Sequence, residues 1–415
     1  MPQNWLKVPA IGNFRMRNRL NKSIFILLCV FFCCFAIQYI QAGVLRKSCA
    51  IIEVALMVFL TLFYIDKHFV CQTYVGRAYL IKFALSIIVF PWTICIGKGD
   101  ISIYATLMQV IWSLFAYIGI MIGYNCQINT NQIKKCCLIF IFAVAISSFL
   151  YVKTTLGSIA IYEQYAGVEK NALGQLIAAA HVLSLLMFFK YSNINKYILL
   201  LTSVFLLILV LCIRARLATV GAFFGDIIIL FIYFFKTPNN LTKLFYTLLI
   251  LSILISASLI FDIDLVHKSI RDFVYNSFFL NKGEDLSSGR ITLNLYAIET
   301  LLSDPLWGNI TVGRKELMIH NYVLNTLFTS GLIGAAGSLF IYVIVGILCI
   351  KNILVIKSLS WMNVGYILVL MLYIGSLGEP CFPFSPGSAV IFQYFLLGVA
   401  LKSTARNKLT STRLQ

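Results

Sequence analysis

Apolar runs of about 20 residues recur along the whole chain, and a run of this length is what an α-helix needs to cross the hydrocarbon core of a bilayer. They begin at Ile24–Ile40 and continue to 386–401. Of the 415 residues, 60% are hydrophobic and only 12% are charged, whereas soluble globular proteins carry about 25% charged residues. The sequence therefore predicts an all-α integral membrane protein that crosses the bilayer many times.

Twelve runs are predicted as membrane spans. The first is followed by many others and has no small-residue cleavage site, so we interpret it as a retained span rather than a signal peptide. The tenth is too long for one straight crossing, and Gly331 and Gly334 predict a break in it, with a short helix before the span proper. The predicted spans are 24–41, 49–65, 79–97, 101–124, 136–153, 171–189, 197–213, 217–235, 244–262, 321–350, 358–377 and 386–401.

Lysine and arginine predict the orientation, because the links on the cytoplasmic side of membrane proteins are enriched in these residues. Basic residues are concentrated in the N-terminal segment, in the links that follow the even-numbered spans and in the C-terminal tail. Both termini are therefore predicted to be cytoplasmic. This distribution also accounts for the net charge of +18 without a nucleic-acid partner.

One external link, residues 263–320, has 58 residues, and links longer than about 15 residues are usually functional or disordered. It separates the first nine spans (1–262) from the last three and the tail (321–415). Its stretch "SSGRITLNLYAIETLLSDPLWGN" predicts an amphipathic helix with Ser288 as its N-cap and Ser303-Asp304-Pro305 as its end. We expect this external helix to lie over the membrane domain. The residues with helical spacing are Ile291, Leu295, Ile298 and Leu302.

Three short segments place cationic or titratable side chains on the same external side. Arg214 and Arg216 lie in the turn between spans seven and eight, Arg290 begins the predicted external helix, and His320 ends the long link. Arginines often simply flank a span, and Arg290 could be a solvated loop charge. Positive charge is, however, normally depleted on this side, and the planar guanidinium group grips phosphate through paired hydrogen bonds. The arginines are therefore candidates for binding a phosphorylated ligand.

His320 has two interpretations, an interfacial polar anchor or a general base that takes a proton from a hydroxyl group. Asn321 could orient a sugar or cap the following helix, while Arg314 and Glu379, also external, are candidates for substrate binding. Of the acids predicted to lie within the membrane, Glu53 and Asp226 could pair with arginines or with substrate. His181 is predicted to bond a neighbouring helix. The cysteines show no metal-ligand spacing, so neither a metal site nor a disulfide framework is predicted.

Several short motifs between residues 165 and 340 follow one another in a distinctive order. They are "KNALGQL" at the start of span six, the short turn containing Arg216, "SSGR" followed by "DPLWGN", and "HN" followed nine residues later by "GLIG". In this order and spacing the region resembles the O-antigen ligase and O-antigen polymerase superfamily of bacterial membrane glycosyltransferases. The turn departs from the usual family pattern, because Ala215 precedes Arg216 and Leu217 follows it. Whether Arg214 or Arg216 is the matching residue therefore stays open, with Arg216 favoured.

The resemblance implies an inner-membrane enzyme whose site faces the periplasm and whose donor is a glycan on undecaprenyl diphosphate. Arg216 and Arg290 would hold the diphosphate, and His320 would activate the acceptor hydroxyl. We expect a metal-independent, inverting repeat-unit polymerase without a cofactor; its partners would be the lipid-linked oligosaccharide, the bilayer and a chain-length regulator. The alternatives are an O-antigen ligase, which transfers the glycan to lipid A core, and a flippase for lipid-linked oligosaccharides.

Overall fold

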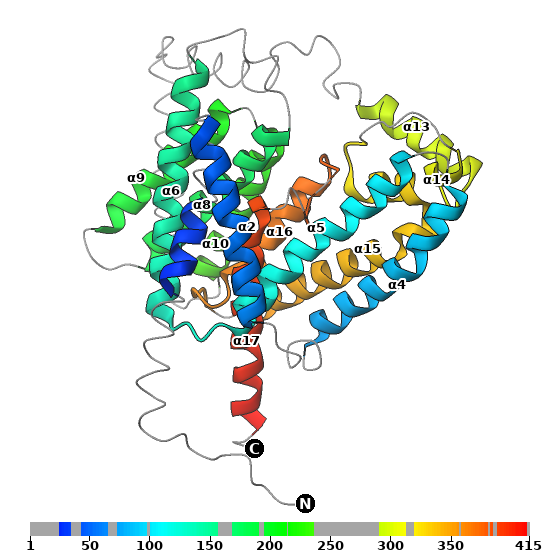
Figure 1. Cartoon of the computed structure of the whole chain (residues 1–415). Helices are drawn as coiled ribbons and strands as arrows, with labels where there is room; N and C mark the ends of the chain where they lie inside the picture. Colours follow the sequence, from blue (N-terminus) through cyan, green and yellow to red (C-terminus); the bar gives the residue numbers. More distant parts are fainter. Residues whose placement is uncertain are drawn as a thin grey trace, which may run out of the picture.

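A computed structural model describes the chain over residues 25–34, 43–64, 73–97, 100–156, 168–190, 195–213, 215–235, 290–312, 319–356, 358–380, 382–384 and 388–412. In these residues the protein consists of α-helices and short links, and no strand occurs among them. Figure 1 shows α13 and α14 beside α15 and α4 on one side of the molecule, with α6 and α9 on the other.

Every predicted span except 244–262, which lies outside the described residues, overlaps a helix, although several ends differ by five residues or more. Within the described residues, six helices are long and apolar enough to cross a membrane, and several other apolar helices are shorter. The predicted number of twelve spans stays a prediction. Besides a short helix at Phe25–Cys34, the helices are α2 (Gly43–Tyr64), α4 (Tyr74–Ile96), α5 (Asp100–Asn125), α6 (Thr130–Leu156), α8 (Val168–Lys190), α9 (Asn195–Cys212), α10 (Arg216–Phe235), α13 (Arg290–Ser303), α14 (Asn309–Val312), α15 (Tyr322–Val355), α16 (Val364–Ser376) and α17 (Ser388–Thr412).

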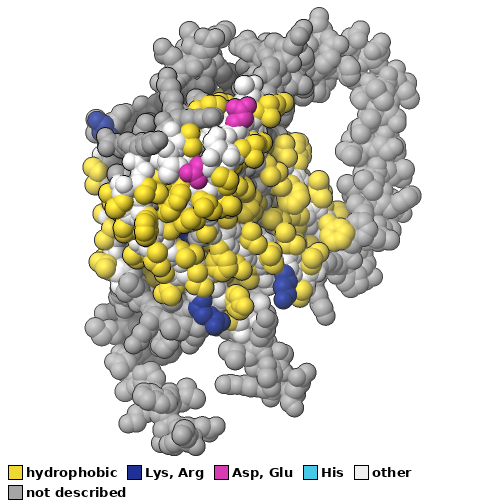
Figure 2. Space-filling model, turned by 90° about the vertical axis from the view of Figure 1, so that its right-hand side faces the viewer, with side chains coloured by type: hydrophobic (Ala, Val, Ile, Leu, Met, Phe, Trp, Pro, Cys, Tyr) yellow, Lys and Arg dark blue, Asp and Glu magenta, His cyan; other side chains and the backbone are white. Residues whose placement is uncertain are grey.

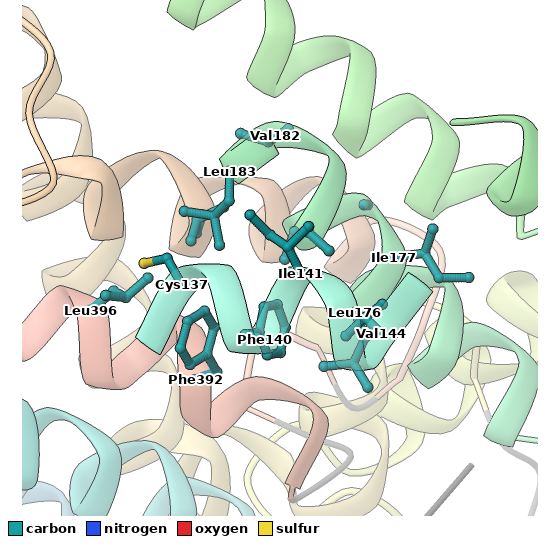
Figure 3. Close-up of a cluster of buried hydrophobic side chains, with 14 of the residues drawn as sticks. Cys137, Phe140, Ile141, Val144, Leu176, Ile177, Val182, Leu183, Phe392 and Leu396 are labelled. Atoms are coloured by element: carbon teal, nitrogen blue, oxygen red, sulfur yellow. The ribbon is translucent and has the colours of Figure 1, made fainter. Parts of the chain in front are cut away.

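Helix α8 forms the centre of the described bundle, because its side chains are buried around almost its whole circumference. It packs against α6, α9 and α10, and α17 covers a further part of α6. Between α6 and α17 the rings of Phe140 and Phe392 stack with their centroids 3.9 Å apart (Figure 3). The other labelled side chains in this view are aliphatic apart from Cys137, and they include Leu176 and Leu183 of α8. This apolar packing fixes the position of α8 relative to the helices around it.

Glycines allow α5 and α17 to approach each other closely. A Cβ atom at Gly123 would lie 2.0 Å from the backbone oxygen of Phe395, and one at Gly398 would lie 2.1 Å from the backbone oxygen of Ile120. Small residues at helix contacts are a common way for membrane helices to gain packing, since lipid provides little drive for helices to associate. The close packing of α5 against α17 therefore helps to hold the bundle together.

Two polar clusters connect helices inside the bundle. His181 of α8 lies 2.9 Å from the Oδ2 atom of Asp226 in α10 and 2.8 Å from the backbone oxygen of Ser203 in α9. The predicted bond of His181 to a neighbouring helix is thus confirmed, and its partner is one of the two intramembrane acids. Polar groups within a membrane usually face the bundle interior and pair there, as these do. The other acid, Glu53 of α2, is buried.

The second cluster contains a buried lysine for which the sequence suggested no role. Lys82 of α4 donates hydrogen bonds to the backbone oxygen of Gln109 and to the hydroxyl of Ser113 in α5. The side-chain amide of Gln109 in turn donates to the hydroxyl of Thr329 in α15, at 2.8 Å. The cluster therefore links α4, α5 and α15 two residues before the point where α15 breaks.

The predicted break in α15 occurs at Gly331, whose φ of 59° and ψ of −172° are non-helical, while the helix continues through Gly334. A break leaves backbone N–H groups without their helical acceptors. The turn after α13 supplies these acceptors: the backbone oxygens of Pro305 and Leu306 accept from the N–H groups of Leu332 and Ile333 at 2.9 and 3.1 Å. The "DPLWGN" motif is therefore a cap for the second half of α15.

Asp304 holds this turn in shape. Its Oδ1 atom accepts hydrogen bonds from the backbone N–H groups of Leu306 and Trp307, and its Oδ2 atom accepts from the hydroxyl of Thr311. The bond from Thr311, with those from the backbone, lowers the pKa of Asp304 below its ordinary value. The hydrogen bonds to the ionised carboxylate therefore stabilise the fold at pH values above the ordinary pKa of an aspartate. This stabilisation is lost as the pH falls through the lowered pKa of Asp304.

Replacing Gly331 by alanine should destabilise the protein by about 2 kcal/mol, because only glycine readily adopts this backbone conformation. A Cβ atom there would also lie 2.3 Å from the backbone oxygen of Leu306. The midpoint of thermal unfolding in detergent measures the effect. Gly221→Ala is the matched control, since its Cβ would have its nearest contact at 3.4 Å. Equal midpoints for the two variants would contradict this account of the break.

The helix predicted within the link 263–320 is confirmed as α13, and it ends at Ser303 as expected; its position outside the membrane stays a prediction, and the predicted N-cap, Ser288, lies outside the described residues. Ala297 and Thr300 of α13 are buried. The helix contacts α15, and Ala297 packs with Phe328 of α15 and with Ile319. The four residues whose spacing predicted the helix are on the opposite side and are exposed. The spacing identified the helix but not the face that packs on the protein.

Candidate functional site

The carboxyl group of Glu379 is the point at which side chains from several helices meet. Glu379 follows α16 and its side chain is only 10% exposed. The Nη2 atom of Arg290 lies 3.4 Å from its Oε1 atom, and the Nδ1 atom of His320 lies 3.9 Å from its Oε2 atom. Asn171 of α8 donates to Oε1 at 2.9 Å. A single carboxylate thus bonds an arginine and an amide and lies close to a histidine, all three distant from it in sequence.

The beginnings of four helices surround this carboxylate. Asn171 lies in the first turn of α8, Arg290 is the first residue of α13, and Asn321 is the N-cap of α15. The fourth is α10, which starts at Arg216. Helix N-termini expose unpaired N–H groups and carry a partial positive charge. Four of them, together with the guanidinium of Arg290, favour binding of an anion here.

Gly378 allows α10 and α13 to meet beside Glu379. A Cβ atom at this position would lie 2.5 Å from the Cδ1 atom of Leu217 and 2.9 Å from the Nη1 atom of Arg290. Any larger residue would therefore displace the guanidinium group or the start of α10. The contact places Leu217, the residue after Arg216, against the same turn as Arg290.

Asn321 fixes the start of α15 next to this turn. Its side-chain oxygen accepts a hydrogen bond from the N–H of Leu324 at 3.0 Å, and its side-chain amide donates to the backbone oxygen of Leu377 at 3.4 Å. An N-cap of this kind determines where a helix begins. Of the two roles predicted for Asn321, the structure shows the cap, which holds His320 beside Glu379.

The structure brings together four of the residues that the sequence singled out, namely Arg290, His320, Asn321 and Glu379. Arg216 begins α10 next to this group, but its side chain lies outside the described part of the chain. Arg214 and Arg314 lie outside it altogether. Which of the two arginines in the turn matches the family pattern therefore stays open.

Sequence reasoning did not assign a role to Asn171 or Gly378. Asn171 belongs to the "KNALGQL" motif, so the motif itself was a signal, although nothing in it indicated a bond to a residue 208 positions away. The same motif contributes Gln175, whose amide nitrogen would lie 2.8 Å from a Cβ atom at Gly375 of α16. The motif thus contacts both the last turn of α16, at Gly375, and the carboxylate of Glu379 just after it.

The exposed fractions of the side chains indicate which groups a ligand can reach. Arg290 is 37% exposed and His320 is 32% exposed, whereas Glu379 is almost buried. The arginine and histidine can therefore contact a ligand from the solvent side, while the carboxylate lies on their buried side. A cation and an imidazole on one surface suit an anionic ligand and a proton transfer.

Basic residues lie at the far ends of two of these helices, α8 and α15, and in the later half of α17. Lys190 ends α8, whose first turn carries Asn171. Lys351 lies near the end of α15, and Lys402 lies in the later half of α17, which points away from α13 in Figure 1. Charge is thus distributed unevenly between the two ends of the bundle.

No protein-family model matches this chain, and no curated protein sequence matches it either.

Proposed function

We propose that this chain is a membrane glycosyltransferase that uses a glycan on undecaprenyl diphosphate as donor and extends a polysaccharide by repeat units. The observation that carries the proposal is the convergence of Arg290 and His320 on Glu379, which follows them in the sequence by 89 and 59 residues, respectively. These are the groups that the reaction needs: a fixed cation for a departing diphosphate and a base for an acceptor hydroxyl. The resemblance of the motifs to O-antigen polymerases and ligases supports the same chemistry.

In the proposed reaction the acceptor oxygen attacks the anomeric carbon from the face opposite the diphosphate. A new C–O bond forms as the bond to the diphosphate oxygen breaks, which inverts the anomeric centre. The proton of the acceptor hydroxyl passes to His320, and the bonding electron pair leaves with the lipid diphosphate. Negative charge grows on the leaving group during this step, so Arg290 and the helix N-termini stabilise the transition state more than the ground state.

Glu379 has a positioning role in this proposal. The Nδ1 atom of His320 lies 3.9 Å from its Oε2 atom, and we therefore assign Nε2 as the nitrogen that takes the acceptor proton. The Oε1 atom, shared by Arg290 and Asn171, fixes the guanidinium group beside the beginning of α13. A carboxylate that holds a catalytic histidine in the correct orientation is a recurring device in enzymes.

The distribution of lysines supports a periplasmic site. Lys190, Lys351 and Lys402 lie toward the helix ends opposite the site, and cytoplasmic ends are the ones enriched in basic residues. The bacterial inner membrane, cytoplasmic termini and a site that faces the periplasm are therefore parts of the proposal.

The test is to incubate the purified chain, reconstituted in vesicles, with lipid-linked repeat units alone. A ladder of longer chains on a gel would support the polymerase. Product that forms only after lipid A core is added would replace the polymerase with the ligase. Movement of the lipid-linked unit across the vesicle membrane without any glycosyl transfer would replace both with a transporter.

Replacing Glu379 by glutamine should lower kcat on the order of 10²-fold while KM changes little, because the charge that orients Arg290 and His320 is lost. Glutamine keeps a side-chain oxygen that can accept from Asn171, so the fold should remain intact. The rate of ladder formation over a range of donor concentrations separates kcat from KM. Glu379→Asp, which is charged but shorter, should recover only part of the rate. An unchanged kcat in Glu379→Gln would show that the carboxylate has no role in positioning.

A further inference from the structure

The outward face of α13 is apolar although the helix lies outside the predicted spans. Its four residues, called here the α13 stripe, are exposed to 63%, 56%, 44% and 76%: Ile291, Leu295, Ile298 and Leu302. They repeat at intervals of three and four residues and so lie along one line of the helix. The face that packs on α15 is on the opposite side and contains Ala297 and Tyr296, both of which lie against Phe328. Both faces of α13 are therefore apolar, and only one of them is covered by α15.

The α13 stripe is continuous with a surface that belongs to a membrane span. The turn after α13 is hydrogen-bonded to α15 through the backbone oxygens of Pro305 and Leu306. Leu306, Leu332 and Ile333 at this junction are all exposed. Further along α15 the exposed apolar residues continue at helical spacing: Phe340, Val343, Ile347, Ile350 and Leu354. Figure 2 shows hydrophobic side chains over most of the described part of this side of the molecule.

One flank of the α13 stripe is polar, as in helices that lie at a membrane surface. Thr292, Glu299 and Ser303 are exposed, and the 100° rotation per residue places them together beside the stripe. A stripe of aliphatic residues with a polar flank suits the boundary between headgroups and acyl chains. Protein interfaces, by contrast, rely on Trp, Tyr and Arg, with Leu under-represented, and the stripe contains only Ile and Leu. Lipid is therefore favoured over a second protein chain.

We propose that α13 is an interfacial helix whose stripe contacts the lipid bilayer, at the boundary between headgroups and acyl chains. Arg290 directly precedes the first stripe residue, so the lipid contact holds its guanidinium group at the level of lipid phosphates. A lipid-linked diphosphate would approach the site at this same level. The lipid contact itself stands independently of the transferase chemistry.

The test places an additional tryptophan on the stripe and measures its quenching by brominated lipid. The full chain, as Leu302→Trp or Ile298→Trp, is reconstituted in vesicles of phosphatidylethanolamine and phosphatidylglycerol. The acyl chains carry bromine near the headgroup, near the methyl end, or not at all. Subtracting the wild-type emission isolates the added tryptophan. Ser303→Trp is the matched control, because Ser303 is exposed, directly follows Leu302 and lies on the polar flank.

Shallow bromine should reduce the added emission of both stripe variants by roughly twofold or more, and deep bromine should reduce it less, since interfacial helices enter only about 5–10 Å. The Ser303→Trp emission should fall clearly less than either. Stripe emission that no brominated lipid quenches would overturn the proposal. If that emission were also shifted to shorter wavelength, a protein surface, either another segment or a second copy, would be covering the stripe. Equal quenching of the stripe and control positions would overturn the proposed orientation of α13. Measuring two stripe variants guards against a failure of either one to fold.

Discussion

Arg290→Ala is expected to abolish chain growth in the ladder assay, with a loss of at least 10²–10³-fold, the order found when a fixed donor to a developing negative charge is removed. Arg290 begins α13 and its Nη2 atom is fixed by Glu379 at 3.4 Å. In the proposed reaction its charge would therefore already be in place when the diphosphate departs. Arg290→Lys should recover only a minor part of the rate, because a lysine keeps the charge but not the planar fork. The amount of protein in the membrane should not change.

Two comparisons make this result specific. Arg77→Ala removes an exposed arginine that lies over the ring of Tyr74 in α4 and should retain activity. The double variant Arg290→Ala with Glu379→Gln separates two explanations. If Arg290 served only to neutralise Glu379, the double variant would be as active as Glu379→Gln alone; if Arg290 contacts the diphosphate, the double variant should be far less active than Glu379→Gln. Long chains made by Arg290→Ala itself would show that the site assignment is wrong.

His320→Ala is expected to lower kcat by about 10²–10⁴-fold, the usual contribution of a general base. KM for the donor should change much less, because the diphosphate is held by other groups. Single-turnover measurements of glycosyl transfer provide the check. The variant should remain folded, since His320 is a third exposed and the beginning of α15 is capped by Asn321 rather than by the histidine.

Added imidazole tests whether the missing group is a base. It should restore part of the activity of His320→Ala, because it supplies a proton acceptor in the space that the side chain leaves. The same addition should have no effect on Arg290→Ala, which lacks a cation rather than a base. If His320→Ala kept its full rate, the interfacial-anchor interpretation of this residue would be the correct one.

The candidate site was partly predictable because its polar residues lie at the ends of apolar runs. Arg290, His320 and Glu379 are conspicuous there, since charged groups near a membrane surface need a partner or a ligand. Asn171 was not predictable as a partner of Glu379, because their contact depends on how α8 and α16 pack. The same holds for Gly378, whose lack of a side chain matters only because Leu217 and Arg290 approach it.

The amino-acid sequence by itself determined that this is a helical membrane protein, which stretches of the described chain are helical, and that α15 breaks near Gly331. These properties depend on hydrophobic length, helix period and the conformational range of single residues, all of which are local. Only the tertiary structure decided that Glu379 gathers side chains from three other helical segments, and that the α13 stripe faces away from α15. A periodic pattern defines which residues share a face of a helix; what that face contacts depends on the packing of segments far apart in the chain.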